Sequence, residues 1–176
     1  EYALPSAESP MVFVMTPGMA LEDYYIVNSG GITIPPDGSE IGYRFSEKDP
    51  YGVEPHEGDF AFSCQKGEVN EEGRWDWSCR IRMKKGSGIQ LRHQLVLEQA
   101  PESGYQEIYE WGFKSDQENW DHRDERFLYV SLDDGKYYGH MVFKVRTAGD
   151  YFFDVDGMIN TTGSRELETV YHNYHD

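Results

Sequence analysis

The fold is decided by two stretches of the chain, Phe60-Ala61-Phe62-Ser63-Cys64 and Trp75-Asp76-Trp77-Ser78-Cys79-Arg80-Ile81-Arg82-Met83. In both stretches apolar and polar residues alternate with a period of two, which is the pattern of a β-strand with one buried face. If the chain folds back about residues 66–74, Cys64 lies opposite Cys79 on the apolar face. The pattern therefore predicts an antiparallel hairpin in which the two cysteines are close enough for a disulfide.

A disulfide would also indicate where the protein works. The chain holds 2 cysteines, and a bridge between them favours an oxidising compartment, hence a secreted or cell-surface protein. Over so short a loop the bridge would stabilise the fold by about 3 kcal/mol through chain entropy. The alternative is a pair of reduced thiols packed in the core of a cytosolic protein. The facing register favours the bridge.

The rest of the chain continues the pattern of short strands. Its 13 Tyr, 9 Phe and 4 Trp residues suit a pleated surface and can fill a core that has few aliphatic side chains. About nine to eleven strand-like segments recur every 8–12 residues or so, separated by turn residues. The sequence predicts one all-β domain over residues 16–176, an antiparallel β-sandwich of jelly-roll type. Residues 1–15 are predicted to form an extended arm that carries the strand-like run Met11–Met15.

Three segments test the details of this prediction. Residues 89–98 alternate well, so they are expected to form one strand that places His93 on the apolar face with Leu91. Residues 115–126 are polar and predict a loop or one short helix. Residues 165–174 predict a strand or a short terminal helix.

The charge of the chain is strongly negative, with 32 acidic and 16 basic residues and a formal net charge of −16. Such a surface repels phosphate backbones and anionic lipids, which makes nucleic acid and acidic membranes poor partners. No apolar run approaches the roughly 20 residues of a membrane-spanning helix. The acidity indicates either a well-solvated exterior or the binding of cations.

Three Asp-rich segments offer oxygen ligands for calcium. They are Asp133-Asp134-Gly135, the pair Asp154 and Asp156, which precedes Gly157, and Asp121 with Asp124-Glu125. Calcium takes six to eight oxygen ligands in proteins, and the loops of a sandwich can supply them. Asp and Gly are also the ordinary residues of tight turns without metal.

Aromatic residues near turns and strand ends predict a sugar-binding surface, because their flat faces can stack on sugar rings. The candidates are Trp120, Trp111, Tyr137 and Tyr138. Trp120 is the first choice, since its charged neighbours give it little reason to lie in the core. The triplet Asn160-Thr161-Thr162 further predicts an N-glycan on a surface loop.

An enzymatic alternative comes from Arg92, His93, His140 and Tyr138, which are expected to converge with Gln90 and Gln94 in a cleft. A tyrosine and a histidine beside an arginine would suit β-elimination from a uronic acid, with the arginine neutralising the carboxylate. The fragments Gln90-Leu91-Arg92-His93 and Ser164-Arg165-Glu166-Leu167 resemble parts of the motifs of jelly-roll alginate lyases. That resemblance implies a polysaccharide lyase. His93 equally fits a satisfied core histidine.

Residues 60–64 and 72–79 are similar to one loop of dermatopontin-type matrix proteins, over about an eighth of the chain. The resemblance implies a role in matrix or adhesion. The leading prediction is a secreted, non-enzymatic module that recognises carbohydrate or a protein, with calcium as an optional ligand. A structural variant is a fibre or matrix subunit that associates with itself when the arm adds a strand to a neighbouring copy.

Overall fold

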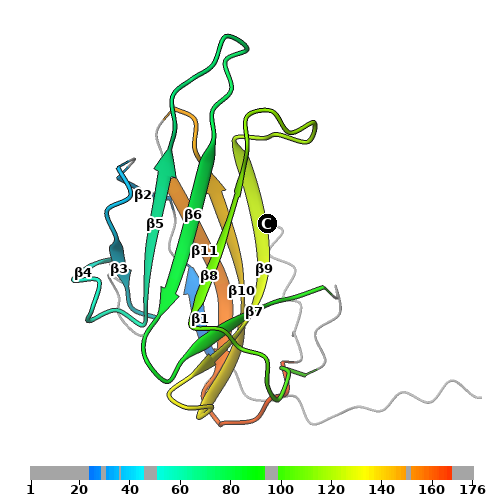
Figure 1. Ribbon diagram of the computed structural model, residues 1–176. Helices are drawn as coiled ribbons and strands as arrows, with labels where there is room; N and C mark the ends of the chain where they lie inside the picture. Colours follow the sequence, from blue (N-terminus) through cyan, green and yellow to red (C-terminus); the bar gives the residue numbers. More distant parts are fainter. Residues whose placement is uncertain are drawn as a thin grey trace, which may run out of the picture.

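The computed structural model describes residues 24–28, 31–35, 37–45, 51–93, 99–149 and 152–167 of the chain. This part is all-β, with two antiparallel sheets and no helix (Figure 1). It accordingly contains no helix of the length and hydrophobicity that a membrane crossing needs. The predicted arm over residues 1–15, with its run Met11–Met15, lies outside the described residues.

The first sheet has five strands in the order β4-β3-β5-β6-β8. Their bounds are β3 (Ile41–Tyr43), β4 (Tyr51–Val53), β5 (Phe60–Lys66), β6 (Trp77–Met83) and β8 (Ile108–Phe113). The predicted hairpin is confirmed as the pair β5 and β6, and Cys64 lies directly opposite Cys79. Both cysteines are buried free thiols that approach to 2.5 Å. The disulfide itself stays a prediction.

The second sheet has six strands. Five follow the order β1-β11-β10-β9-β7, and β2 also pairs with β11. Their bounds are β1 (Tyr24–Asn28), β2 (Ile32–Thr33), β7 (Gly88–Leu91), β9 (Arg123–Leu132), β10 (Tyr137–Arg146) and β11 (Phe152–Asn160). Two neighbouring pairs in each sheet are also consecutive in the chain, namely β3–β4 and β5–β6 in the first sheet and β9–β10 and β10–β11 in the second. The predicted all-β fold of two antiparallel sheets is confirmed, while the jelly-roll connectivity stays a prediction.

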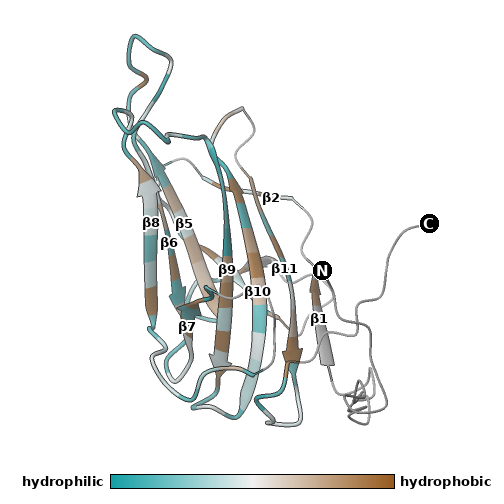
Figure 2. Cartoon of the chain, turned by 90° about the vertical axis from the view of Figure 1, so that its right-hand side faces the viewer, coloured by the Kyte–Doolittle hydropathy of each residue, from teal (hydrophilic) through white to brown (hydrophobic). Residues whose placement is uncertain are grey.

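The apolar faces of the two sheets meet in one core rich in aromatic rings. Phe143 of β10 lies at its centre, with its ring centroid 4.9 Å from that of Phe62 in the opposite sheet and 5.2 Å from that of Phe153 on β11. Figure 2 shows the alternation of apolar and polar residues along β9 and β10. Because the inward residues of both sheets interdigitate, the fold is a sandwich.

Two predicted segments differ from the structure. Strand β7 ends at Leu91, and His93 is exposed beyond it, so the expectation of a core histidine is wrong. The rest of that segment, residues 94–98, lies outside the described residues. Residues 115–122 form turns, which confirms the loop there and excludes the helix, but residues 123–126 of the same predicted segment belong to strand β9.

The edges of the sandwich differ in length. Strands β4 and β8 end the five-stranded sheet, and β1 and β7 end the main path of the other sheet. Of these, β8 is the longest with 6 residues, and it pairs with β6 in a regular register. Ile108, at its start, is one of two exposed large hydrophobic residues in the described part of the chain, with 38% of its surface accessible.

Candidate functional site

A polar groove runs over the outer face of the five-stranded sheet. The antiparallel register places the outward-facing residues in rows across β5, β6 and β8, and one such row is Gln65, Ser78 and Gly112. Of these three residues, only Gln65 has a long side chain. Two adjoining hollows of about 440 and 720 Å³ lie here, and both are lined by Gln65 and Ser78. This surface is called the sheet groove below.

Gly112 keeps the floor of the sheet groove low. A Cβ atom at this position would lie 2.1 Å from the backbone carbonyl oxygen of Trp77, so no other residue fits without moving the strand. The next row holds Ser63, Arg80 and Glu110, and Ser63 is again small. The hollow shape therefore follows from small residues at the outward positions of neighbouring strands.

The charged side chains along the sheet groove balance one another. Its lining holds three basic and three acidic residues: Lys66, Arg80, Lys114, Glu40, Asp76 and Glu110. Arg80 Nε lies 3.3 Å from Glu110, and Lys114 Nζ lies 2.9 Å from Asp76. Glu40 pairs with Arg82, which lowers the pKa of Glu40 through a charged hydrogen bond. The lining has no net charge, although the whole chain carries −16.

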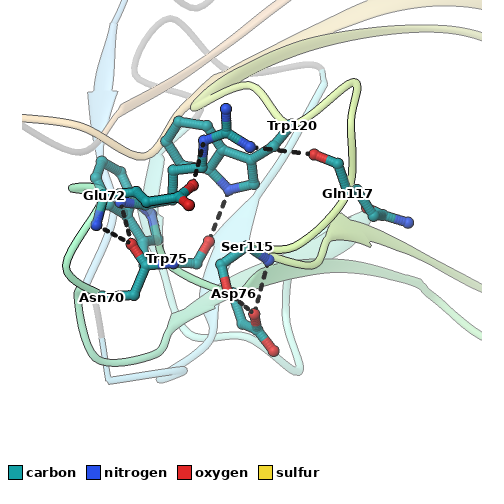
Figure 3. Close-up of polar contacts among 8 residues, drawn as sticks. Asn70, Glu72, Trp75, Asp76, Ser115, Gln117 and Trp120 are labelled. Atoms are coloured by element: carbon teal, nitrogen blue, oxygen red, sulfur yellow. Dashed lines mark hydrogen bonds and ion pairs between the residues drawn. The ribbon is translucent and has the colours of Figure 1, made fainter.

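One end of the sheet groove is closed by two loops, residues 67–76 and 114–122, which Figure 1 shows at the same end of the sandwich. Asp76 holds them together, since it accepts hydrogen bonds from the backbone and hydroxyl of Ser115 at 2.8 and 2.9 Å (Figure 3). These bonds, with the Lys114 ammonium, lower the pKa of Asp76 to about 2. The contact should therefore persist from neutral pH down to strongly acidic solution.

Trp75 and Trp120, one from each of these loops, pack edge to face with 5.1 Å between their ring centroids. The indole Nε1 of Trp120 donates to the carbonyl oxygen of Trp75 at 2.8 Å (Figure 3). The Arg74 guanidinium lies 5.8 Å from the Trp120 ring. Trp120 is thus half-buried and packs against the core, and it is not the freely exposed ring that its charged neighbours suggested.

Replacing Trp120 with phenylalanine should therefore affect stability. The change keeps an aromatic ring but removes the donor to the Trp75 carbonyl, and we expect the free energy of unfolding to fall by about 1 kcal/mol. Urea denaturation measures this loss. Val69→Ala in the neighbouring loop is the control, because Val69 is 56% exposed and should change stability by less than about 0.5 kcal/mol. Equal midpoints for both variants would contradict the structural role of Trp120.

The other predicted sugar-binding aromatics lie elsewhere. Trp111 is 9% exposed, and its ring packs in the core against Phe62 and Phe143. Tyr137 and Tyr138 follow the β9–β10 turn, at the opposite end of the sandwich from Trp120 (Figure 1). The structure does not bring these four residues together, and the ring of Trp111 faces away from solvent.

The predicted calcium ligands of the first two Asp-rich segments form two separate pairs. Asp133 and Asp134 lie in a left-handed turn with φ of 50° and 58°, and Asp133 lies 3.6 Å from Lys84 Nζ. Asp156 pairs with Lys144 at 3.1 Å, while burial and Asp156 raise the pKa of Asp154. Within the described ranges, no group of three or more His, Cys, Asp or Glu residues could hold a metal ion. Calcium binding stays a prediction.

The surface position predicted for Asn160 is wrong. Its side chain is 0% exposed, and its amide nitrogen donates to the carbonyl of Glu166 at 3.0 Å. Its amide oxygen accepts hydrogen bonds from the backbone and hydroxyl of Thr162 at 2.9 and 2.7 Å. The buried Asn160 side chain therefore closes a surface turn in which Thr162 is exposed, and its amide has no room for a glycan.

Part of the predicted enzymatic cluster does converge, on the outer face of the six-stranded sheet. Gln90, Tyr129 and His140 form one row across β7, β9 and β10, with Arg92 one row further along. Tyr138 lies on the same face but packs against Tyr105, with 6.3 Å between ring centroids. His93 is exposed beyond the strand, and Gln94 lies outside the described residues.

Comparison of the chain with models of protein families, with curated proteins and with solved structures gave no match. The sheet groove is the part that sequence reasoning missed. Its signal was present in Ser63 and Ser78, two small polar residues at outward positions of paired strands.

Proposed function

We propose that the protein is a secreted, non-enzymatic module that binds a neutral carbohydrate in the sheet groove. The observation that supports this most is the composition of the lining, where hydroxyl, amide and paired charged groups lie side by side without net charge. Sugar hydroxyls both donate and accept, so they need donors and acceptors close together. The side chains of Ser78, Gln65 and Glu110 offer this mixture.

A protein partner fits the sheet groove less well. The centres of protein interfaces are enriched in aromatic and other large apolar residues and depleted in charge. Among the described residues, the exposed large hydrophobics are Val69 and Ile108, and neither lines the groove. A small polar ligand therefore fits this surface better than another protein does.

Secretion is proposed together with a Cys64–Cys79 disulfide. The backbone N–H of Gly67 donates to the Asp76 carbonyl at 2.8 Å, so these two residues form a hydrogen-bonded pair of the hairpin. Such pairs alternate along an antiparallel ladder, which makes Cys64 and Cys79 a non-hydrogen-bonded pair. Side chains are closest in such pairs, so the geometry supports a bridge and, through it, an oxidising compartment.

The proposal can be tested by affinity electrophoresis in gels that contain a neutral β-glucan, xylan or galactomannan, with polygalacturonate as the acidic comparison. We expect at least one neutral polymer to retard the protein. Ser78→Tyr should weaken this retardation at least tenfold, because the ring fills the groove floor, while leaving the melting temperature unchanged. Thr33→Tyr is the matched control at an exposed strand position of the other sheet.

Three outcomes would contradict the proposal. They are no retardation by any neutral polymer, retardation by polygalacturonate alone, and undiminished binding by Ser78→Tyr. Release of an unsaturated product from polygalacturonate, seen as new ultraviolet absorbance, would favour the polysaccharide lyase instead. Repeating the gels with a calcium chelator tests whether the metal assists binding.

A further inference from the structure

A second polar cluster lies on the outer face of the six-stranded sheet, away from the sheet groove. His140 of β10 is paired with Tyr129, which in turn is paired with Gln90 of β7. The backbone N–H of Arg92 donates to the carbonyl of Phe127 at 2.8 Å, which continues the same register by two residues. Arg92 and His140 therefore occupy adjacent rows of one face, and the three side chains Gln90, Arg92 and His140 are called the arginine–histidine cluster.

The polar atoms of this cluster are buried without partners. Both ring nitrogens of His140, Nε of Arg92 and Oε1 of Gln90 are shielded from solvent and make no hydrogen bond. Buried polar atoms in folded proteins nearly always have a partner, because an unmet hydrogen bond is costly. Nine such atoms occur in the described part of the chain, and four of them gather on these three neighbouring side chains, which points to a partner that is not part of the chain.

The charge of the cluster is also uncompensated. Eight ion pairs of Arg and Lys occur among the described residues, and Arg92 belongs to none of them. Its guanidinium lies over the Phe127 ring, 4.9 Å from the centroid. Burial and the charge of Arg92 lower the pKa of His140 to about 4, so the imidazole is neutral at pH 7. Tyr129, Tyr138 and Tyr105 lie close by on this face, and the row beyond Phe127 and Val142 holds Glu125 and Lys144.

We infer that the arginine–histidine cluster binds the carboxylate group of a small ligand. A guanidinium offers two parallel N–H donors that match a carboxylate. The neutral imidazole can donate one further hydrogen bond, and Oε1 of Gln90 can accept one from a neighbouring hydroxyl or amide. One positive charge matches one carboxylate, whereas a phosphate dianion would leave a negative charge unpaired.

The cluster is approached from the end of β7. Arg92 is half-buried and the next residue, His93, is exposed, so part of the Arg92 side chain faces solvent at this end. On the other side the turn at Gly104 packs against Gln90, with a Cβ at Gly104 only 3.3 Å from its amide nitrogen. The turn therefore closes the side of the cluster at Gln90.

The test is an NMR titration of the His140 imidazole in the full chain, with four probes: galacturonate, a Gly-Asp dipeptide, inorganic phosphate and uncharged galactose. A bound carboxylate neutralises Arg92, so the pKa of His140 should rise from about 4 by at least one unit. Galacturonate or the dipeptide should cause this rise. The probe that binds more tightly shows whether the natural ligand is a sugar acid or a peptide. Galactose should cause none.

Arg92→Gln should abolish the shift while the rest of the spectrum stays that of the folded protein. Arg146→Gln is the matched control, because Arg146 lies on the same face with its guanidinium 5.9 Å from the Phe152 ring. The control should keep the full shift. An unchanged pKa with both carboxylates, a rise with phosphate alone, or an equal rise in Arg92→Gln would overturn the inference. None of these results bears on neutral-sugar binding in the sheet groove, so the two proposals fail independently.

Discussion

Phe143→Ala should lower the free energy of unfolding by about 3–5 kcal/mol, the largest loss expected from any single substitution discussed for this chain. Phe143 is 0% exposed and joins the two sheets. Its ring stacks on Phe153 and contacts Phe62, and it also meets Phe60 and Trp111 edge to face. Rings from both sheets surround it, so the site has little freedom to collapse around a methyl group.

Urea denaturation, followed by tryptophan fluorescence, measures this loss as a shift of the midpoint at constant slope. Phe143→Leu is a graded comparison that keeps most of the volume, and it should lose less than half as much. Val69→Ala again serves as the exposed control. A loss below about 1 kcal/mol for Phe143→Ala would contradict a single core shared by both sheets.

Reduction of the proposed Cys64–Cys79 bond should cost about 3 kcal/mol, the second largest effect. The comparison is between oxidised and reduced wild-type protein, because reduction leaves every packing atom in place. The two cysteines close a short loop, and the loss of stability comes mainly from the greater freedom of the unfolded chain. Denaturant midpoints in the presence and absence of reductant give the difference.

The bond itself can be detected by alkylating the denatured protein before and after reduction and measuring the mass of each product by mass spectrometry. We expect two labels only after reduction. Burial and the neighbouring Cys64 raise the pKa of Cys79, so a folded, reduced hairpin holds almost no reactive thiolate. The bond must therefore form while the chain folds, and protein for this test has to be produced in an oxidising compartment. Two labels without reductant in such protein would contradict the bridge and weaken the proposal of secretion.

The hairpin could be predicted from sequence because its signal is local. Period-two alternation on both sides of one polar turn leaves a single register that buries every apolar residue, and that register pairs Cys64 with Cys79. The end of β7 could not be predicted in the same way. Residues 89–98 keep alternating, but the paired strand ends at Leu91, and His93 lies beyond it.

The placement of Trp111 and Asn160 shows where local patterns fail. Glu110 faces outward beside Arg80, so the next residue of the same strand, Trp111, faces the core. This could have been inferred by pairing β8 with β6, but the order of strands in a sheet is a tertiary property. Asn160 is likewise held by a hydrogen bond to the carbonyl of Glu166, a residue that lies outside the Asn160–Thr162 triplet used for the prediction.

The candidate sites were predicted in part. Arg92 and His140 were expected to converge, and they do so because both occupy outward positions of strands that flank β9. The sheet groove was not predicted, since three strands supply its lining and each contributes only one or two small residues. A hollow that arises from small side chains on several strands produces only a weak pattern in any one segment of the sequence.

The unprotected edge at β8 would give the predicted self-association a direction. Within the described residues, no strand pairs with its outer side, and its regular backbone is a template for a further extended segment. Strand β1 lies on the opposite side of the sandwich (Figure 2). If a segment of one copy added a strand to β8 of the next, the contact would join unlike surfaces, and such contacts generate rings or open filaments and not a two-fold pair.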